Sequence, residues 1–392
     1  IRAADIACTP GALSYLLIAK RECHWFIEPE KVPTELGAKL SDAQVHIHPY
    51  VEVTSFIENL PRTSITHVDL AGLSWSLKAS FKGELRLAES LVQWVMALKT
   101  DVEVGHIRNA MAKDAVALTR MFMWLEKEVQ SRPIKETEVA QKIAYFRSQQ
   151  PGYQEESFPA IVGYKGNGAI VHYFAQEDTC AKISNEGMLL IDSGGQYVEG
   201  TTDITRTICL SEPTDEQKRN FTNVLKGNIT LDTQLFPEGT TGMQLDTLAR
   251  MHLWNDGLNY GHGTGHGVGY FLRVHEPPQG FATSAITSRG TTGFVPGLFT
   301  SNEPGFYKTD EYGIRIENLM LCVEKEENEY GKFLGHEALT LFPIETKLID
   351  FSMLSQRELD WLNDYHHKVF EAVSSKLEGE ELAWMKEKCK TV

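Results

Sequence analysis

Short apolar runs alternate with polar, helix-like segments over the first part of the chain. Runs at 15–19, 25–27 and 68–70 predict strands, because each is short and bounded by polar or turn-forming residues. Residues 84–98 carry apolar side chains close to helical spacing, which predicts a helix there. The pattern over residues 1–98 therefore indicates an α/β domain, or the latter part of one.

Two longer helices are expected after this region. Apolar residues recur near a 3.6-residue period between 102 and 129, which predicts a long amphipathic helix. Thr137 and Glu138 are typical start signals, so a second helix is expected over 137–149.

The pattern changes from Phe158 onward, where short β-like runs are separated by glycine-rich turns. The expected strands lie at 160–163, 188–192, 204–209, 268–271, 298–301 and 313–321. Helices are expected over 215–233 and 241–253, and a largely helical tail that includes 356–375 follows Pro343. This mixed order predicts an α+β fold with a curved antiparallel sheet.

The composition is that of a folded protein with more than one domain. Its 392 residues are 42% hydrophobic and 23% charged, and the formal charge is 38 − 53 = −15. This acidic balance argues against binding nucleic acid through the phosphate backbone. The sequence has no apolar run long enough for a membrane span. The six cysteines are scattered without a CxxC pair, which favours reduced thiols in the cytoplasm.

Two aspartates stand at the ends of neighbouring expected strands. Asp192 ends an apolar run and precedes Gly194-Gly195, where a tight turn is expected, and Asp203 returns on the next strand. On antiparallel neighbours, two such side chains can project from the same face. Taken alone, an aspartate ahead of two glycines is more often a turn residue than a ligand.

Two histidines alternate with five glycines in the segment GHGTGHGVG, residues 261–269. Glycine permits close approach of the backbone to a ligand. So many glycines exclude a normal helix, so His262 and His266 are not a helical ligand pair despite their spacing. His275 follows in the segment VHEPP.

Two glutamates complete the set of candidate ligands. Glu303 lies in TSNEPGFY and Glu317 in GIRIEN. Because side chains alternate along a strand, Arg315 and Glu317 are expected on one side, with Ile314 and Ile316 on the other. By itself this pattern is more typical of a solvated strand edge than of a site.

Considered together, these signals predict a site for two divalent ions. The candidate ligands are Asp192, Asp203, His266, Glu303 and Glu317. Their oxygen-rich character favours manganese, cobalt or iron, with zinc as an alternative. Four carboxylates balance two divalent ions, and a bridging hydroxide leaves one negative charge, which suits a substrate with a positive amino terminus. Two such ions can generate hydroxide near neutral pH and stabilise the oxyanion of an attacked carbonyl.

Other catalytic motifs are absent from the sequence. It contains no HExxH, GxSxG, P-loop or GxGxxG motif. The sequence therefore does not favour a serine hydrolase or a nucleotide-dependent enzyme.

Six motifs in order carry a family resemblance: DSGGQY, TTDITRT, HGTGHGVG, VHEPP, NEPGFY and GIRIEN. They resemble those of the Xaa-Pro aminopeptidases (aminopeptidase P), metallopeptidases of the "pita-bread" fold. The likeness runs from about Lys99 to Pro343, and the tail resembles the C-terminal extension of the longer, three-domain members. It implies a pita-bread catalytic domain at 99–345, a partial creatinase-like α/β domain at 1–98 and a helical extension at 346–392.

The resemblance implies hydrolysis of the bond between an N-terminal residue and a following proline by a metal-bridging hydroxide. Asp192 is implied to chelate one ion, and Asp203 and Glu317 to bridge both. His266 and Glu303 are implied to complete the coordination of the second ion. Glu303 is also implied to accept the proton of the attacking water. The expected cofactor is a pair of Mn²⁺ ions, with Zn²⁺ and Co²⁺ as alternatives.

The same resemblance assigns roles around the ions. His172, in AIVHY, is implied to contact substrate, while His262 and His275 hold the scissile carbonyl and shape the proline pocket. Tyr307 and Arg315 are implied to support the ligands, and Arg315, on the same side of its strand as Glu317, could orient a ligand carboxylate.

The expected substrates are peptides with proline at the second position, and a cytoplasmic homodimer is implied. No nucleic-acid or membrane partner is expected. Longer family members carry two N-terminal domains, whereas about a hundred residues precede the catalytic part here. The chain opens with IRAAD and lacks an initiator Met, so we expect that the first domain and part of the second are absent.

Two alternatives remain open. A prolidase would cleave only dipeptides that end in proline, so cleavage of a tripeptide such as Arg-Pro-Pro separates it from an aminopeptidase. The same fold also occurs in non-catalytic binding modules, such as histone chaperones, that have lost metal ligands. A pair of stoichiometric metal ions would exclude that class.

Overall fold

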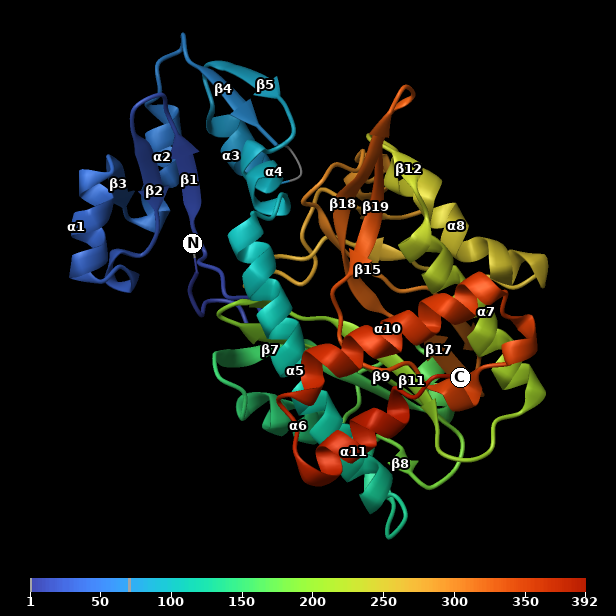
Figure 1. The fold of residues 1–392 in the computed structure, drawn as a ribbon. Helices are drawn as coiled ribbons and strands as arrows, with labels where there is room; N and C mark the ends of the chain where they lie inside the picture. Colours follow the sequence, from blue (N-terminus) through green and yellow to red (C-terminus); the bar gives the residue numbers. More distant parts are fainter. Residues whose placement is uncertain (1, 70–71) are drawn as a thin grey trace. The chain divides into compact units, whose positions relative to one another are not determined.

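The computed structural model describes residues 2–69 and 72–392 (Figure 1). The chain divides into two compact units, Ile1–Val95 and Met96–Val392. The division lies three residues ahead of the boundary expected between residues 98 and 99.

The first unit combines a three-stranded sheet with a separate pair of strands. Strands β1 (Tyr15–Ile18) and β2 (Cys23–Phe26) are antiparallel, and β2 is parallel to β3 (Val45–His48). Strands β4 (Ile65–Val68) and β5 (Glu84–Leu87) are parallel. The helices are η1 (Pro29–Lys31), α1 (Thr34–Asp42), η2 (Tyr50–Glu52), α2 (Val53–Glu58), α3 (Trp75–Ser80) and α4 (Leu91–Ala97), which crosses into the second unit. Parallel strands with intervening helices confirm the expected α/β character.

Two details of this unit differ from the sequence-based expectation. The helix expected over 84–98 is wrong in its first half, because 84–87 form β5 and pair with β4 before α4 begins. The expected strand at 68–70 is shifted: β4 ends at Val68, and Leu70 lies outside the described residues. The strands expected at 15–19 and 25–27 are confirmed to within two residues at each end.

The buried core of the first unit is small. One cluster among its described residues comprises Phe26, Val53, Ile57 and Leu77, with partly buried aromatic and leucine side chains packed against it. One face of the β1–β2–β3 sheet therefore packs on α2 and α3.

The second unit opens with two long helices, α5 (Asp101–Glu128) and α6 (Glu136–Ser148), which confirm the helices expected at 102–129 and 137–149. The hydroxyl of Thr100 accepts a hydrogen bond from the Glu103 N–H, and the Glu103 carboxylate accepts one from the Thr100 N–H. This capping box explains why α5 begins where it does.

The strands of the second unit pair antiparallel throughout the described residues. One sheet holds β7 (Tyr153–Tyr164), β9 (Met188–Tyr197), β10 (Gly200–Thr201) and β11 (Ile204–Cys209). The other runs β12 (Phe236–Pro237), β19 (Gly331–Ala338), β18 (Asn318–Asn328) and β15 (Phe299–Asn302). Two-stranded pairs are β13 (Gly265–His266) with β14 (Gly280–Phe281), β16 (Gly305–Lys308) with β17 (Tyr312–Arg315), and β6 (Ile134–Lys135) with β8 (Lys182–Ile183). This arrangement confirms the expected α+β class.

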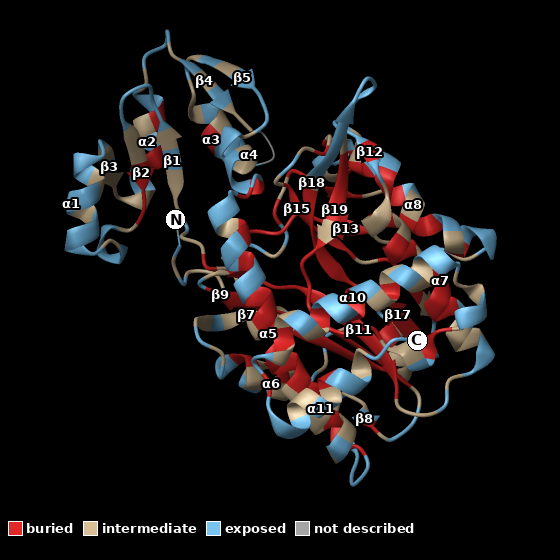
Figure 2. Ribbon diagram, viewed as in Figure 1, coloured by how far each residue is buried: buried red, intermediate tan, exposed pale blue. Residues whose placement is uncertain are grey.

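Helices cover these sheets. They are η3 (Lys165–Ala169), α7 (Asp215–Thr233), α8 (Gly242–Asn255), α9 (Ser288–Thr291), η4 (Thr346–Leu348), η5 (Phe351–Met353), α10 (Gln356–Ser374) and α11 (Gly379–Lys388). The helices expected at 215–233, 241–253 and 356–375 are confirmed. Residues of α10, such as Leu362 and Val369, share one core with Leu319 and Leu321 of β18. Figure 2 shows this core as the buried strands and inner helix faces of the second unit.

The tight turn expected at Gly194-Gly195 is wrong, because β9 continues through both glycines to Tyr197. A Cβ atom on Gly194 would lie 2.0 Å from the carbonyl oxygen of Thr202 and 2.1 Å from Ser157 Oγ. Glycine is needed here for the close approach of a neighbouring strand rather than for a turn.

Two expected strands are also wrong in part. Residues 268–271 are not a strand, because the chain turns back when the Gly269 N–H bonds to the Arg273 carbonyl. The strand expected over 313–321 is interrupted: β17 ends at Arg315 and β18 begins at Asn318. The interruption arises because the Glu317 N–H bonds to the Thr205 carbonyl instead of continuing either ladder.

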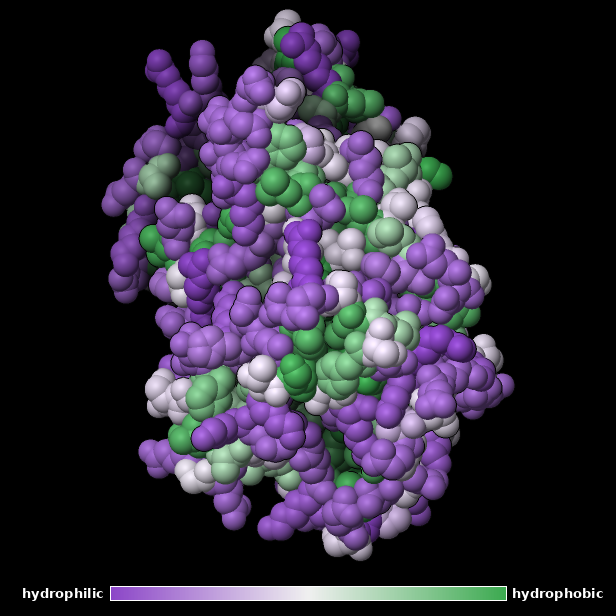
Figure 3. All heavy atoms as spheres, turned by 45° about the vertical axis from the view of Figure 1, so that its right-hand side comes forward, coloured by the Kyte–Doolittle hydropathy of each residue, from purple (hydrophilic) through white to green (hydrophobic). Residues whose placement is uncertain are grey.

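All six cysteines are free thiols, as expected from their scattered spacing. Over residues 2–69 and 72–392, no helix is both long and apolar enough to cross a bilayer. Figure 3 shows one face of the molecule, on which hydrophilic residues predominate and hydrophobic residues form small groups.

Candidate metal centre

The two aspartates face the site because of the register between β9 and β11. Asp192 lies opposite Thr205 in that antiparallel pair, and Asp203 precedes Thr205 by two residues. Side chains two residues apart lie on the same face of a strand, so both carboxylates project the same way. The expectation drawn from strand alternation holds, although Asp203 lies just ahead of β11.

His266 is held in place by two glycines. A Cβ atom on Gly265 would lie 2.1 Å from the Ser301 carbonyl oxygen, and one on Gly267 would lie 2.2 Å from the Glu276 carbonyl oxygen. These positions accept only glycine unless the backbone moves, because β13 packs directly on its neighbours. The imidazole Nδ1 lies 3.0 Å from the Gly267 carbonyl oxygen. A carbonyl only accepts, so Nδ1 carries the proton and the Nε2 lone pair faces the carboxylates.

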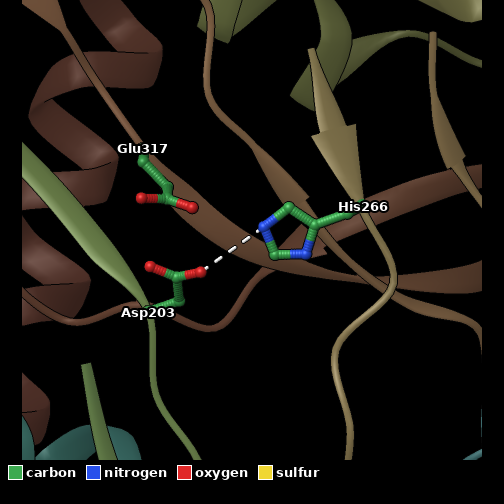
Figure 4. A group of neighbouring side chains, drawn as sticks. All are labelled: Asp203, His266 and Glu317. Atoms are coloured by element: carbon green, nitrogen blue, oxygen red, sulfur yellow. Dashed lines mark ion pairs between the residues drawn. The ribbon is translucent and has the colours of Figure 1, made fainter. Parts of the chain in front are cut away.

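Asp203, His266 and Glu317 converge, with ligand atoms that all lie within 4.8 Å of one another (Figure 4). All three are buried, and His266 Nε2 lies 3.5 Å from Asp203 Oδ2. These residues come from segments as far apart in sequence as the β10–β11 connection and the β17–β18 connection. Arg315 and Glu317 are 2% and 1% exposed, so this segment is not the solvated edge that its pattern alone suggests.

Glu303 and Asp192 flank this group. Glu303 Oε1 lies 3.4 Å from His266 Nε2 and accepts a hydrogen bond from Ser301 Oγ at 3.1 Å. Asp192 Oδ2 accepts a hydrogen bond from Arg315 Nη2 at 2.5 Å, whereas its buried Oδ1 has no hydrogen-bond partner. A buried carboxylate oxygen without a partner is costly, and a cation is the partner that would satisfy it.

The electrostatics of the group also fit cations. Burial, and then the charge of Asp192, raises the pKa of Asp203 well above its usual value. Burial, and then the charge of Asp203, does the same for Glu317, and burial raises the pKa of Glu303 to about 7. Carboxylates buried side by side oppose one another's ionisation. A pair of divalent cations would remove that opposition, so the donor set fits the two-metal site.

A chain of hydrogen bonds leads outward from Asp192. Arg315 Nη1 donates to the Tyr307 hydroxyl at 2.7 Å, and that hydroxyl lies 2.8 Å from His262 Nε2. His262 Nδ1 lies 2.8 Å from the Gly263 carbonyl oxygen, so Nδ1 carries the proton and the tyrosine hydroxyl donates to Nε2. Burial, and then the charge of Arg315, lowers the pKa of His262 to about 4. His262 is therefore held as a neutral imidazole.

His275 and His172 form an outer rim. The ring of His275 lies edge-on to that of His266, with centroids 4.0 Å apart. The charge of His266 lowers the pKa of His275 to about 3. His172 is exposed, and its charge adds smaller contributions at both His262 and His275, which places it near them. His275 thus lies beside His266, and His172 lies near His275 and His262.

Three supporting residues have roles that the sequence analysis did not assign. Thr205 Oγ1 donates to Glu317 Oε2 at 2.8 Å and accepts from Arg315 Nε at 3.1 Å. Ser301 binds both Glu303 and the His266 N–H. Lys99 forms a buried ion pair of 2.7 Å with Glu276, the residue after His275. The signal for Thr205 was available, since it lies two residues from Asp203 on the same strand face.

Comparison with known proteins identifies three matching regions. The model for metallopeptidase family M24 matches residues 105–324, that for the C-terminal region of peptidase M24 matches 332–392, and that for the Creatinase/Prolidase N-terminal domain matches 1–103. The first alone covers more than half of the chain.

Individual relatives extend this match. The chain is 38% identical to aminopeptidase P2 of Arabidopsis thaliana, over 97% of this chain and 58% of that protein. It superposes with a TM-score of 0.94 at 37% identity on an X-prolyl aminopeptidase from Caenorhabditis elegans, described as a cytosolic enzyme with a di-nuclear active site, over 99% of this chain and 65% of that one. An Xaa-Pro dipeptidase from Bacillus anthracis matches with a TM-score of 0.67 at 25% identity. The match covers 86% of this chain and 89% of that one.

The chain thus spans 58% and 65% of the length of the two aminopeptidases. Its second unit has the pita-bread fold, and an N-terminal creatinase-type domain precedes it. On the strength of the buried Asp–His–Glu group and a family match over most of the second unit, this chain belongs to metallopeptidase family M24.

Proposed function

We propose that this protein is a metal-dependent aminopeptidase that hydrolyses the bond between an N-terminal residue and a following proline. The observation that carries the proposal is the buried convergence of Asp203, His266 and Glu317, with Glu303 3.4 Å from the same imidazole. The aminopeptidase names of its relatives support the choice of substrate.

Asp192, Asp203, His266, Glu303 and Glu317 would hold two divalent ions, which, when bound, supply a low-pKa water and positive charge opposite the attacked carbonyl. The oxygen-rich donor set supports Mn²⁺ as the resident ion, with Co²⁺ and Zn²⁺ as alternatives. Reactivation of chelated protein by each ion in turn would identify the most effective one.

The side chains supply the remaining steps. Glu303 accepts the proton of the attacking water and passes it towards the leaving proline nitrogen. His262, a neutral imidazole held by Tyr307, would orient the scissile carbonyl. The Arg315–Asp192 contact fixes the carboxylate, and Thr205 fixes Glu317, so the ligands are pre-oriented. His172 and His275 lie on the rim, where they can contact the substrate and shape the proline pocket.

Cleavage of the tripeptide Arg-Pro-Pro tests this function directly. The aminopeptidase reading predicts release of free arginine, abolished by chelation and restored by Mn²⁺. An intact tripeptide together with cleavage of an Xaa-Pro dipeptide would favour the dipeptidase reading, which the likeness to the Bacillus anthracis enzyme supports. Failure to cleave either peptide, with no stoichiometric metal, would indicate a non-catalytic binding module.

Three further assignments belong to this proposal. The catalytic domain comprises 99–345, with the N-terminal domain at 1–98 and the helical extension at 346–392. The family matches at 1–103, 105–324 and 332–392 support this order of domains. The protein works in the cytoplasm, which its six free thiols and the cytosolic relative support. It forms a homodimer, which size-exclusion chromatography with light scattering would test.

A further inference from the structure

Arg206 of β11 is buried between the candidate metal centre and the C-terminal part of the second unit. Its Nη1 donates to the Thr205 carbonyl oxygen at 3.0 Å and to the Glu317 carbonyl oxygen at 2.6 Å. Its Nε donates to the Pro343 carbonyl oxygen at 3.0 Å. One guanidinium therefore joins β11, the β17–β18 connection and the segment that leads into the C-terminal helices.

The other terminal nitrogen of this guanidinium faces helix α10. Nη2 donates to the Tyr365 hydroxyl at 2.9 Å, to the Phe342 carbonyl oxygen at 2.7 Å and to Asn318 Oδ1 at 2.8 Å. The Tyr365 hydroxyl in turn lies 3.0 Å from the Phe342 carbonyl oxygen and 3.2 Å from Asn318 Oδ1, to either of which it can donate. Tyr365 thus shares two acceptors with the arginine and holds it from the side of α10.

Glu317 depends on Thr205 and Arg206 for its position. Its N–H bonds to the Thr205 carbonyl oxygen at 3.1 Å, its own carbonyl accepts from Arg206, and its Oε2 accepts from Thr205 Oγ1 at 2.8 Å. Glu317 lies in the break between β17 and β18, so these bonds take the place of a strand ladder. A shift of the guanidinium would therefore move the backbone from which the carboxylate projects.

The burial of Arg206 differs from that of other buried arginines. Arg147 and Arg250 pair with the carboxylates of Asp114 and Asp246. The acceptors of Arg206 named above are neutral carbonyl, amide and hydroxyl oxygens, and burial of a charge without a charged partner is costly. A guanidinium offers five N–H groups in one plane, so it can join several segments at once, which a lysine ammonium cannot do.

We propose that Arg206 positions Glu317 for metal binding and that Tyr365 holds Arg206 in place, so that helix α10 contributes to the metal affinity of the centre. This role rests on the proposed two-metal site and gives the C-terminal region a part in it. Both residues act through Glu317 and are positioning residues rather than ligands.

Titration of Mn²⁺ into the chelated full chain by calorimetry, with thermal unfolding of the same chelated samples, tests this role. Tyr365→Phe removes one hydroxyl and keeps a ring stacked on Trp361, where the centroids lie 5.2 Å apart. It is expected to weaken Mn²⁺ binding by about three- to tenfold. The matched control Tyr164→Phe removes a hydroxyl that binds Ser184 and the Glu186 carbonyl in the same unit. That control should leave the Kd for Mn²⁺ unchanged.

Arg206→Lys is expected to have the larger effect, about 10–100-fold in the Kd for Mn²⁺, because the ammonium can bind only some of the acceptors. Should this variant fail to fold, Tyr365→Phe alone decides the matter. If Tyr365→Phe lowers the Tm of the chelated protein as Tyr164→Phe does but leaves the Kd for Mn²⁺ unchanged, Tyr365 serves folding only and the proposal is overturned. Wild-type protein that binds no Mn²⁺ would overturn the two-metal site as well, so the two failures are distinguishable.

Discussion

The buried carboxylates and the rim histidines of the candidate centre differ in how the fold holds them. Asp203, His266 and Glu317 are buried and fixed by strand register and by hydrogen bonds from the protein. His172 and His275 are exposed and lie outside the strands. The first set suits retention of ions whose ligands must not move, and the second suits a substrate that enters and leaves. Metal retention and turnover should therefore be separable by mutation.

The largest effect is expected where both functions meet, at Glu303. Replacement by Ala removes a metal ligand and the proton acceptor together, so kcat should fall by about 10³-fold or more. The exposed carboxylate Glu326 of β18 offers the matched control, and Glu326→Ala should retain wild-type kcat. Turnover of Glu303→Ala within tenfold of wild type would contradict its role.

His262→Ala should separate turnover from metal retention. It removes a group that orients the substrate and touches none of the proposed ligands directly, so kcat should fall by about 10²-fold while both ions remain bound. Parallel measurement of kcat and of metal content checks this. Loss of the ions would show that His262 belongs to the buried set instead.

Tyr307→Phe should give a smaller loss, about tenfold in kcat. The hydroxyl accepts from Arg315 and donates to His262, so its removal leaves the imidazole in place but free to reorient. The metal content and the Kd for the metal ion should not change. A loss as large as that of His262→Ala would mean that Tyr307 itself contacts the reacting groups.

The pH dependence of stability should distinguish the chelated protein from the metal-loaded one. In the chelated state the pKa of Glu303 is raised to about 7 against an ordinary value of 4.5, and those of Asp203 and Glu317 are also raised. The folded state then binds more protons than the unfolded state, so stability is greatest below pH 4.5 and is lost as pH rises towards 7. A shift of this size at Glu303 alone corresponds to about 3 kcal/mol.

Binding of the ions should reverse this trend, because bound carboxylates ionise more readily than those of the unfolded chain. Thermal unfolding in chelator and in Mn²⁺, at pH 5 and pH 8, measures both slopes. The same slope in the two conditions would mean that the cations do not bind these carboxylates.

The sequence predicted the helices and most strands of the second unit because their periodicity is local. The prediction was wrong where two segments approach closely. The turn expected at Gly194-Gly195 is part of a strand, and Gly194 is needed there because Thr202 occupies the space that a side chain would take. The break between β17 and β18 was also missed, since it depends on a hydrogen bond from Glu317 to distant Thr205.

The residues of the candidate centre could be selected from the sequence, but their geometry could not. Their residue types and motif order indicated a metal site, whereas the spatial meeting of Asp203 and Glu317 depends on long-range pairing. The outward chain from Arg315 through Tyr307 to His262 shows the same limit, because His262 is 45 residues from Tyr307 along the chain.

If the five candidate ligands share a pair of cations, anomalous diffraction from crystals grown with Mn²⁺ should locate both ions. Two anomalous peaks are expected between the side chains of Asp192, Asp203, His266, Glu303 and Glu317. No peak there, in protein that cleaves Arg-Pro-Pro in the same Mn²⁺ buffer, would show that these residues do not share a pair of cations.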